Sequence, residues 1–305
     1  MNKKRAAFLM AFILFTALSV SAGARVLKDE VVYARLTHEG QPEAIYVVND
    51  FEADTRIQVT DYGSYASALP LAPAEGFAYA EDNATFMMPA GRFAYQGTLI
   101  QGTLPWVIAV SYRLNGEQID PGALSGATGA LQIVLSVMPE DSMRAYADSL
   151  TLQVTITLNR EKCLNIQADR ATSATAGKSQ TLSYVILPGQ DAEYTLSADV
   201  VDFSMDDIQA AGVRMVFDAQ MYQDMFTQSM AGSPFEAVIG DVAGNLIGNM
   251  QGADPVSFTD SRNDVRSLQF VLLIEGIPQQ EVQAPAEVEP APETVWDRLL
   301  HLLGL

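Results

Sequence analysis

Short runs rich in β-branched and aromatic residues recur over residues 31–277, and turn-forming residues separate them. The clearest run, LPWVIAVSYRLNG, begins at Leu104 and alternates two sets of side chains until Asn115 and Gly116. An Asn-Gly pair supplies the positive φ angles that a two-residue hairpin turn requires. This pattern predicts a mainly β chain.

The remaining runs divide the chain into two β regions. A hairpin is predicted over 31–51, and short strands with long loops are predicted from Asp54 to Gly102. Further strands are predicted at 130–138, 150–158, 181–187, 193–203, 212–218 and 265–277. No stretch alternates strands with helices as a parallel α/β sheet would. We therefore expect one or two antiparallel β-sandwich (Ig-like) domains, divided into an N-terminal β domain (25–103) and a β-sandwich domain (104–278).

Two segments have the periodicity of amphipathic helices. The first is predicted to be a short helical insert near 218–232, in which the apolar residues are Met221, Tyr222, Met225 and Phe226. The second is the chain end, 295–305, which follows a Pro-, Ala- and Glu-rich segment at 279–294. That segment has too few large apolar residues to be buried and is predicted to be an extended linker.

The predicted C-terminal helix has one apolar face, formed by Trp296, Leu299, Leu300 and Leu303. It is too short to cross a bilayer, and a helix of this length is marginal alone in water. We expect this face to dock onto the parent domain or a partner protein. Shallow insertion into a membrane interface, giving peripheral membrane contact, and a disordered end are the alternatives.

Residues 1–24 have the layout of a secretory signal. Lys3, Lys4 and Arg5 precede an apolar stretch, and Ala22-Gly23-Ala24 provides small residues for cleavage. We expect cleavage after Ala24, with an uncleaved membrane anchor as the alternative. The sequence thus predicts an extracytoplasmic protein, secreted or associated with the cell surface.

The composition argues against several classes of function. The chain has 18 Lys and Arg against 37 Asp and Glu, a net charge of −19, so it lacks the bases that bind nucleic acid. One cysteine and two histidines are too few for a zinc cluster, and Cys163 alone cannot form an internal disulfide. We expect Cys163 to be a small core residue and Trp106 to be a core or sheet-covering residue.

No motif indicates an enzyme. The stretch ATAGKS at 174–179 lacks the first glycine of a phosphate-binding loop and predicts a plain turn. His38 and His301 are predicted to be solvent-exposed, and neither belongs to a triad pattern. We therefore expect no catalytic residue and no cofactor, although a carboxylate pair that meets only in space stays open.

Two clusters of mainly acidic residues have side chains of the kind that bind calcium, but neither cluster has the sequence spacing of a calcium-binding loop. They are Asp199, Asp202, Asp206 and Asp207, and then Asp260, Asn263 and Asp264. Acidic loops are ordinary in so acidic a chain. We therefore expect no metal site in either group.

Four stretches, at 30–51, 104–133, 151–166 and 255–277, resemble extracytoplasmic β-rich envelope proteins of Gram-positive bacteria. These proteins are related to segments of phage-infection-protein-like sequences and of Leu-x-x-Gly heptad-repeat proteins. The heptads themselves are absent between Asp218 and Ser257, so the resemblance implies no coiled-coil stalk here. It implies no catalytic residue or cofactor either.

These observations favour a non-enzymatic β-sandwich protein, secreted or attached to the envelope, that acts in adhesion, scaffolding or partner binding. The expected partner is an envelope protein or a glycan of unknown identity, and not a nucleic acid. One alternative is a cell-surface carbohydrate-binding or carbohydrate-active protein. The other is an accessory subunit of a membrane complex.

Overall fold

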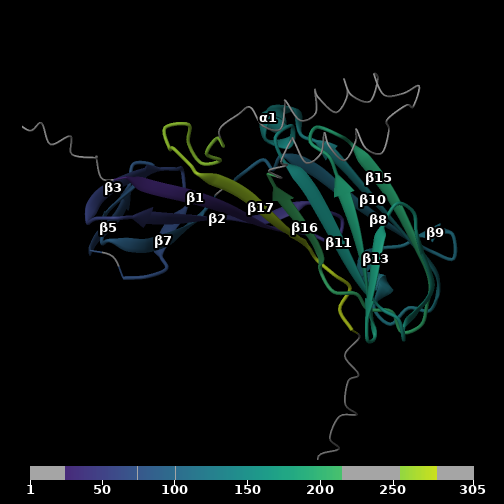
Figure 1. Cartoon of the computed structure of the whole chain (residues 1–305). Coiled ribbons are helices and arrows are strands. Elements are labelled where there is room, and N and C mark those ends of the chain that lie inside the picture. Colours follow the sequence, from purple (N-terminus) through teal and green to yellow (C-terminus); the bar gives the residue numbers. More distant parts are fainter. Residues whose placement is uncertain (1–24, 74, 100, 215–254, 280–305) are drawn as a thin grey trace, which may run out of the picture.

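The computed structural model describes residues 25–73, 75–99, 101–214 and 255–279. Within these residues the chain is mainly β, which confirms this part of the predicted fold class (Figure 1). The strands are β1 (Val26–Leu36), β2 (Pro42–Ala53), β3 (Ile57–Tyr62), β4 (Ser67–Pro70), β5 (Glu75–Ala80), β6 (Asn83–Met88), β7 (Gly91–Thr98), β8 (Trp106–Leu114), β9 (Glu117–Gln118), β10 (Gly129–Pro139), β11 (Thr151–Asn159), β12 (Cys163–Ala168), β13 (Thr172–Ala176), β14 (Ser179–Ile186), β15 (Ala192–Val200), β16 (Ile208–Val213) and β17 (Ser267–Ile274). A single-turn helix, α1, spans Arg144–Ala147 and was not predicted.

The described strands form three sheets. The largest has nine strands in the order β13-β14-β11-β16-β17-β1-β2-β7-β4. A second has the order β12-β15-β10-β8-β9, and the third has the order β3-β6-β5. The nine-stranded sheet takes strands from both sides of the predicted domain boundary at residue 103, because β17 pairs with β1.

The smaller sheets cover different parts of the large one. Phe86 of β6 lies 4.6 Å from Phe93 of β7, between ring centroids, so the three-stranded sheet packs near the β1-β2-β7 end. Trp106 of β8 lies 5.6 Å from Phe270 of β17, so the five-stranded sheet packs on the other part. The molecule is therefore built of layered sheets, and its buried residues form one continuous core.

The first and last strands described, β1 and β17, lie side by side and run parallel, with Val32 opposite Phe270 (Figure 1). Every other strand pair described is antiparallel, as expected. The expectation of purely antiparallel sheets is wrong at this pair. Strand patterns do not reveal which distant strands meet, so they could not predict this pairing.

The predicted hairpins are confirmed where the sequence has strong turn-forming residues. The hairpin over 31–51 is present as β1 and β2, and Asn115 and Gly116 have φ angles of 53° and 87° in the turn after β8. The expectation of long loops from Asp54 to Gly102 is wrong, because five strands follow one another there through short turns. The strand predicted at 212–218 overlaps β16 only at residues 212 and 213, and residues 215–218 lie outside the described ones.

Several predicted segments lie outside the described residues. They are the signal (1–24), the helical insert (218–232), most of the linker (280–294) and the terminal helix (295–305). The docking face of Trp296, Leu299, Leu300 and Leu303 lies there too. Within the described part of the chain, no helix is both long enough and apolar enough to cross a bilayer.

Candidate functional site

The most unusual site is a group of charged side chains buried under the three-stranded sheet. Lys28 is 4% exposed and Glu30 is fully buried, while Asp61 is 2% exposed. Residues two apart on a strand share a face, so β1 directs Lys28 and Glu30 inward beside the apolar Val32. Asp61 points to the same place from β3. We call these three residues the buried charge cluster.

The three side chains are in direct contact. Lys28 Nζ lies 2.6 Å from Asp61 Oδ1 and 2.7 Å from Glu30 Oε1. Two carboxylates and one ammonium leave a formal excess of one negative charge if all three groups are ionised. Burying charge in this way costs several kcal/mol per ion unless other groups compensate. The cluster therefore lowers the stability of the fold unless its charges are well paired.

A loop that follows residue 255 donates hydrogen bonds that compensate the buried charge of Glu30. Ser257 Oγ donates to Oε1 at 2.6 Å, and the amide of Phe258 donates to Oε2 at 2.7 Å. Thr259 Oγ1 adds a third hydrogen bond to Oε1 at 3.2 Å. These donors hold the carboxylate of Glu30 in one orientation, with Oε1 facing Lys28.

Asp61 has fewer hydrogen-bond donors than Glu30. The hydroxyl of Tyr95 donates to Oδ2 at 2.5 Å, and burial is the main cause that raises the pKa of Asp61, against the lowering effect of Lys28. Burial also raises the pKa of Tyr95 and of its neighbour Tyr65. Asp61 is therefore the carboxyl group of the cluster for which a raised pKa is indicated.

Aromatic rings surround the cluster. Lys28 Nζ lies 5.7 Å from the ring centroid of Phe51, which in turn lies 5.3 Å from Phe86. An open cavity of about 250 Å³ adjoins the cluster, and both Lys28 and Asp61 line it. The other charged residues on its wall are Arg262 and Asp264. The cluster is thus bordered by aromatic rings and by this open cavity.

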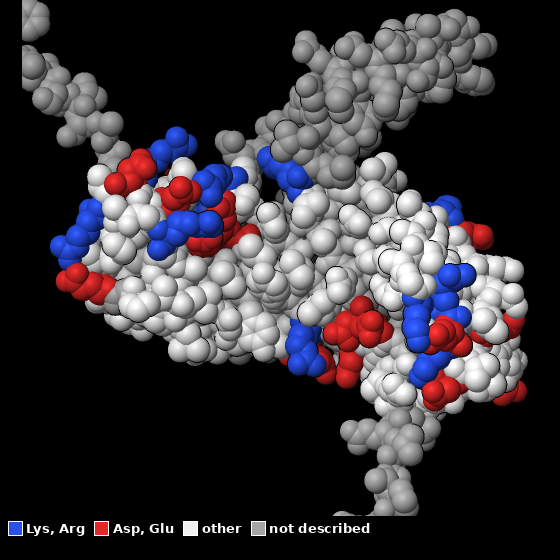
Figure 2. Space-filling model, turned by 60° about the horizontal axis from the view of Figure 1, so that its bottom comes forward, with Lys and Arg blue, Asp and Glu red and all other residues white. Residues whose placement is uncertain are grey.

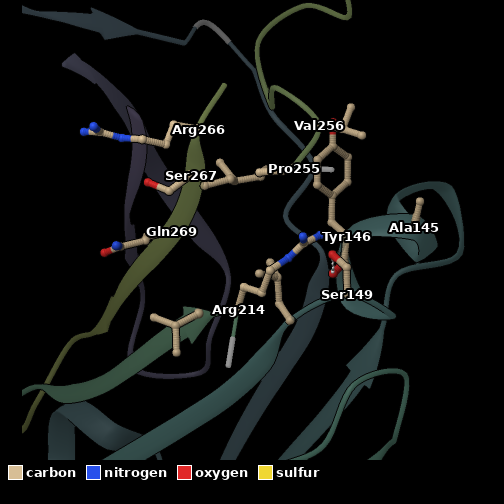
Figure 3. Close-up of a pocket in the computed structure, with 12 residues that line it drawn as sticks. Ala145, Tyr146, Ser149, Arg214, Pro255, Val256, Arg266, Ser267 and Gln269 are labelled. Carbon is tan, nitrogen blue, oxygen red and sulfur yellow. Dashed lines mark hydrogen bonds between the residues drawn. The ribbon is translucent and has the colours of Figure 1, made fainter. Parts of the chain in front are cut away.

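A second cavity, of about 520 Å³, lies between α1 and the start of β17 (Figure 3). Tyr146 and Ser149 form one wall, Ser267 and Gln269 form another, and Arg214 lies between them. Its lining includes Arg214 and Pro255, which adjoin the undescribed residues 215–254. We assign no ligand to it.

Of the residues singled out from the sequence, Asn263 and Asp264 line the cavity beside the buried charge cluster. The others do not belong to the cluster. Cys163 is buried and burial raises its pKa to about 11, which confirms its reading as a core residue. Trp106 is buried too, and 174–179 is a plain hairpin turn in which Gly177 has a φ of 57°. The expectation that His38 is solvent-exposed is wrong, because it is half-buried and its Nδ1 lies 3.0 Å from the carbonyl oxygen of Glu275. His301 lies outside the described residues.

Several of the residues considered for calcium are engaged by other groups of the protein. Asp202 pairs with Lys162 at 2.8 Å, and Asp207 accepts from the amide of Gly276 at 2.9 Å. Asp260 is held by Arg262, while Asn263 bonds to the backbone of Tyr62. Within the described ranges, no three His, Cys, Asp or Glu side chains are grouped as a metal site would need.

The surface chemistry is mixed. Figure 2 shows acidic and basic side chains next to one another in separate clusters, with broad uncharged surface between them. Among the described residues, Arg266 lies 3.0 Å from Asp29 and 3.1 Å from Glu52. Most of the basic side chains visible on this face thus lie next to acidic ones (Figure 2).

Sequence reasoning missed the buried charge cluster, although a signal was present. Lys28 and Glu30 alternate along β1 in step with apolar residues, so two charged side chains lie on an apolar strand face. The apolar residues are Val32, Ala34 and Leu36. A charged pair on the buried face of a strand is unusual and marks a place to search for a partner. Asp61 carried no comparable signal, because β3 lies in a stretch with weak strand patterning.

No family model matches this chain, and no curated protein does. Among solved structures, the chain is similar to the yeast delta-COP-I mu-homology domain, with 8% identity and a TM-score of 0.34 over 83% of this chain and 96% of that one. The same domain complexed with a Dsl1 WxWxV peptide gives 7% identity and a TM-score of 0.38 over the same shares. These likenesses are too weak to assign a function.

Proposed function

We propose that this protein is an extracytoplasmic, non-enzymatic binding protein that recognises an extended segment of a protein partner by adding it to the edge of β13. The location rests on the signal-like N-terminus. The binding mode rests on one observation: β13 is an edge strand whose five residues are all exposed. A strand with no buried side chain adds little to the core, but it presents a row of free backbone groups.

The other described sheet edges have features that hinder pairing with another chain. Of the remaining outer strands, β4 contains Pro70 and β9 has only two residues. The ladders of β5 and β12 are interrupted by register shifts, and on β3 the backbone of Tyr62 is bonded by Asn263. By contrast, β13 reads Thr-Ser-Ala-Thr-Ala, with no proline, no charge and an unbroken ladder. It is therefore the most accessible of these edges for strand addition.

The hairpin register indicates which backbone groups are available. Ala176 and Ser179 flank the two-residue turn and form its closing pair. Hydrogen-bonded and non-hydrogen-bonded pairs alternate along an antiparallel ladder, so the amides of Ser173 and Thr175 point away from β14. A partner strand would use these two positions.

The test uses a displayed library of linear peptides selected against the full chain. Selected peptides should bind wild type and Thr175→Ala, which keeps the backbone amide, and should lose most binding to Thr175→Pro, which removes it. Hydrogen exchange should slow at Ser173 and Thr175 when peptide is bound. Failure to select any peptide, equal binding by the proline variant, or protection only elsewhere would overturn the proposal.

A further inference from the structure

We propose that the buried charge cluster is an autocatalytic cross-linking site, at which Lys28 and Asp61 condense to a side-chain amide with Glu30 as the catalytic proton carrier. The observation is geometric. An amine and a carboxyl group, 33 residues apart in the chain, are buried with 2.6 Å between Nζ and Oδ1. A second carboxylate contacts the same nitrogen at 2.7 Å.

Burial favours this reaction over a permanent ion pair. An amine and a neutral carboxylic acid carry no charge, so moving the proton from Lys28 to Asp61 relieves the cost of keeping both ions out of water. Burial also raises the pKa of Asp61, which favours its protonated form. The rings of Phe51 and Phe86 form an apolar wall beside the cluster.

The fold supplies the proximity. Reacting groups that are held together can have effective concentrations of about 10⁵ M or more, because the cost of bringing them together is already met by folding. Lys28 is fixed by β1 and Asp61 by β3, so neither group needs to diffuse. Tyr95 donates to Oδ2 of Asp61, where it polarises the carboxyl group toward attack.

The atoms and protons balance without a cofactor. After the ammonium of Lys28 has passed one proton to Asp61, the Nζ lone pair attacks Cγ and forms the new C–N bond. Glu30 takes a proton from Nζ and returns it to the departing hydroxyl group, which leaves as water as its C–O bond breaks. The products are a Lys28–Asp61 amide, one water molecule and an unchanged Glu30 carboxylate.

The surroundings suit each role. The hydrogen bonds from Ser257, Phe258 and Thr259 hold Glu30 with Oε1 directed at Lys28, so it can accept and return the proton. The cavity of about 250 Å³ that borders Lys28 and Asp61 provides an exit for the released water. The bond would tie the nine-stranded sheet to the three-stranded sheet, in a chain with a single cysteine.

The experiment is an intact mass measurement of the purified full chain under denaturing conditions, followed by mapping of proteolytic fragments. We expect a mass lower than that of the sequence by one water molecule, and a branched fragment that joins the peptides of Lys28 and Asp61. A folded protein with the full sequence mass would overturn the proposal.

Variants assign the roles. Lys28→Arg and Glu30→Gln should each retain the full sequence mass, whereas Lys162→Arg, which alters the more exposed pair with Asp202, should still lose one water. Asp61→Asn keeps the carbonyl carbon and releases ammonia, so its product should have the same mass as cross-linked wild type. Water loss that persists in Lys28→Arg would exclude this bond, and its persistence in Glu30→Gln would exclude the role of Glu30. The Asp61→Asn variant at its full sequence mass would contradict attack at this carbon.

Discussion

The Tyr95 hydroxyl donates a hydrogen bond to Asp61 Oδ2, with 2.5 Å between the two oxygens. The contact joins β7 of the large sheet to β3 of the small one. It also satisfies the oxygen of Asp61 that does not face Lys28. A buried carboxyl oxygen without such a donor would be costly, because the fold offers it little water.

Replacing Tyr95 with Phe should lower the free energy of unfolding by about 1–3 kcal/mol, since it leaves this buried oxygen without its donor. Urea unfolding followed by circular dichroism measures the change. Tyr33→Phe is a suitable control, because Tyr33 is an exposed residue and its loss of a hydroxyl should cost less than about 0.5 kcal/mol. Equal stability of the two variants would contradict the importance of this contact.

The close approach of β16 to Trp106 depends on a glycine. A Cβ atom built on Gly212 would overlap the Trp106 ring, so Gly212→Ala should destabilise the protein by about 1–3 kcal/mol through overpacking. In Trp106→Phe the smaller ring leaves room, and adding Gly212→Ala to that variant should cost much less. Thermal unfolding of the two single variants and the double variant tests this; additive losses would show that the ring is not the obstacle.

Cys163 should make stability depend on pH in the alkaline range. Burial raises the pKa of its thiol from 9.0 to about 11, so between these values the unfolded chain releases a proton that the folded chain keeps. The contribution of the thiol to the free energy of unfolding is therefore greatest below pH 9.0, and it falls as the pH rises toward about 11.

The matched variant is Cys163→Ala, which cannot titrate. The stability advantage of wild type over this variant, expected to be on the order of 1 kcal/mol near neutral pH, should shrink as the pH rises through that window. Urea unfolding at a series of pH values measures it. A constant difference would mean that the thiol titrates alike in the folded and unfolded states.

Much of the local structure could be predicted from the sequence, because it depends on neighbouring residues. The turn at Asn115 and Gly116 follows from φ angles that few other residue pairs adopt readily. The burial of Cys163 and Trp106 follows from their positions beside or at the start of strand patterns. The strands between Asp54 and Gly102 were harder to predict, since their runs are short and proline and glycine interrupt them.

The buried charge cluster could not be predicted in full, because it depends on contacts between distant segments. Lys28 and Glu30 share a strand face with apolar residues, a signal that was missed, and Asp61 and the loop at Ser257 meet them only through tertiary packing. Alternation predicts which side of a strand is buried, and it does not show what lies opposite.

The parallel pairing of β1 with β17 also determines at what stage of synthesis the large sheet can be completed. The strand that lies beside β1 at the middle of the large sheet is made more than two hundred residues later, so β1 keeps one open edge throughout most of synthesis. Contacts so distant in sequence are slow to form. Among the described strands, the large sheet therefore stays divided until β17 has been made.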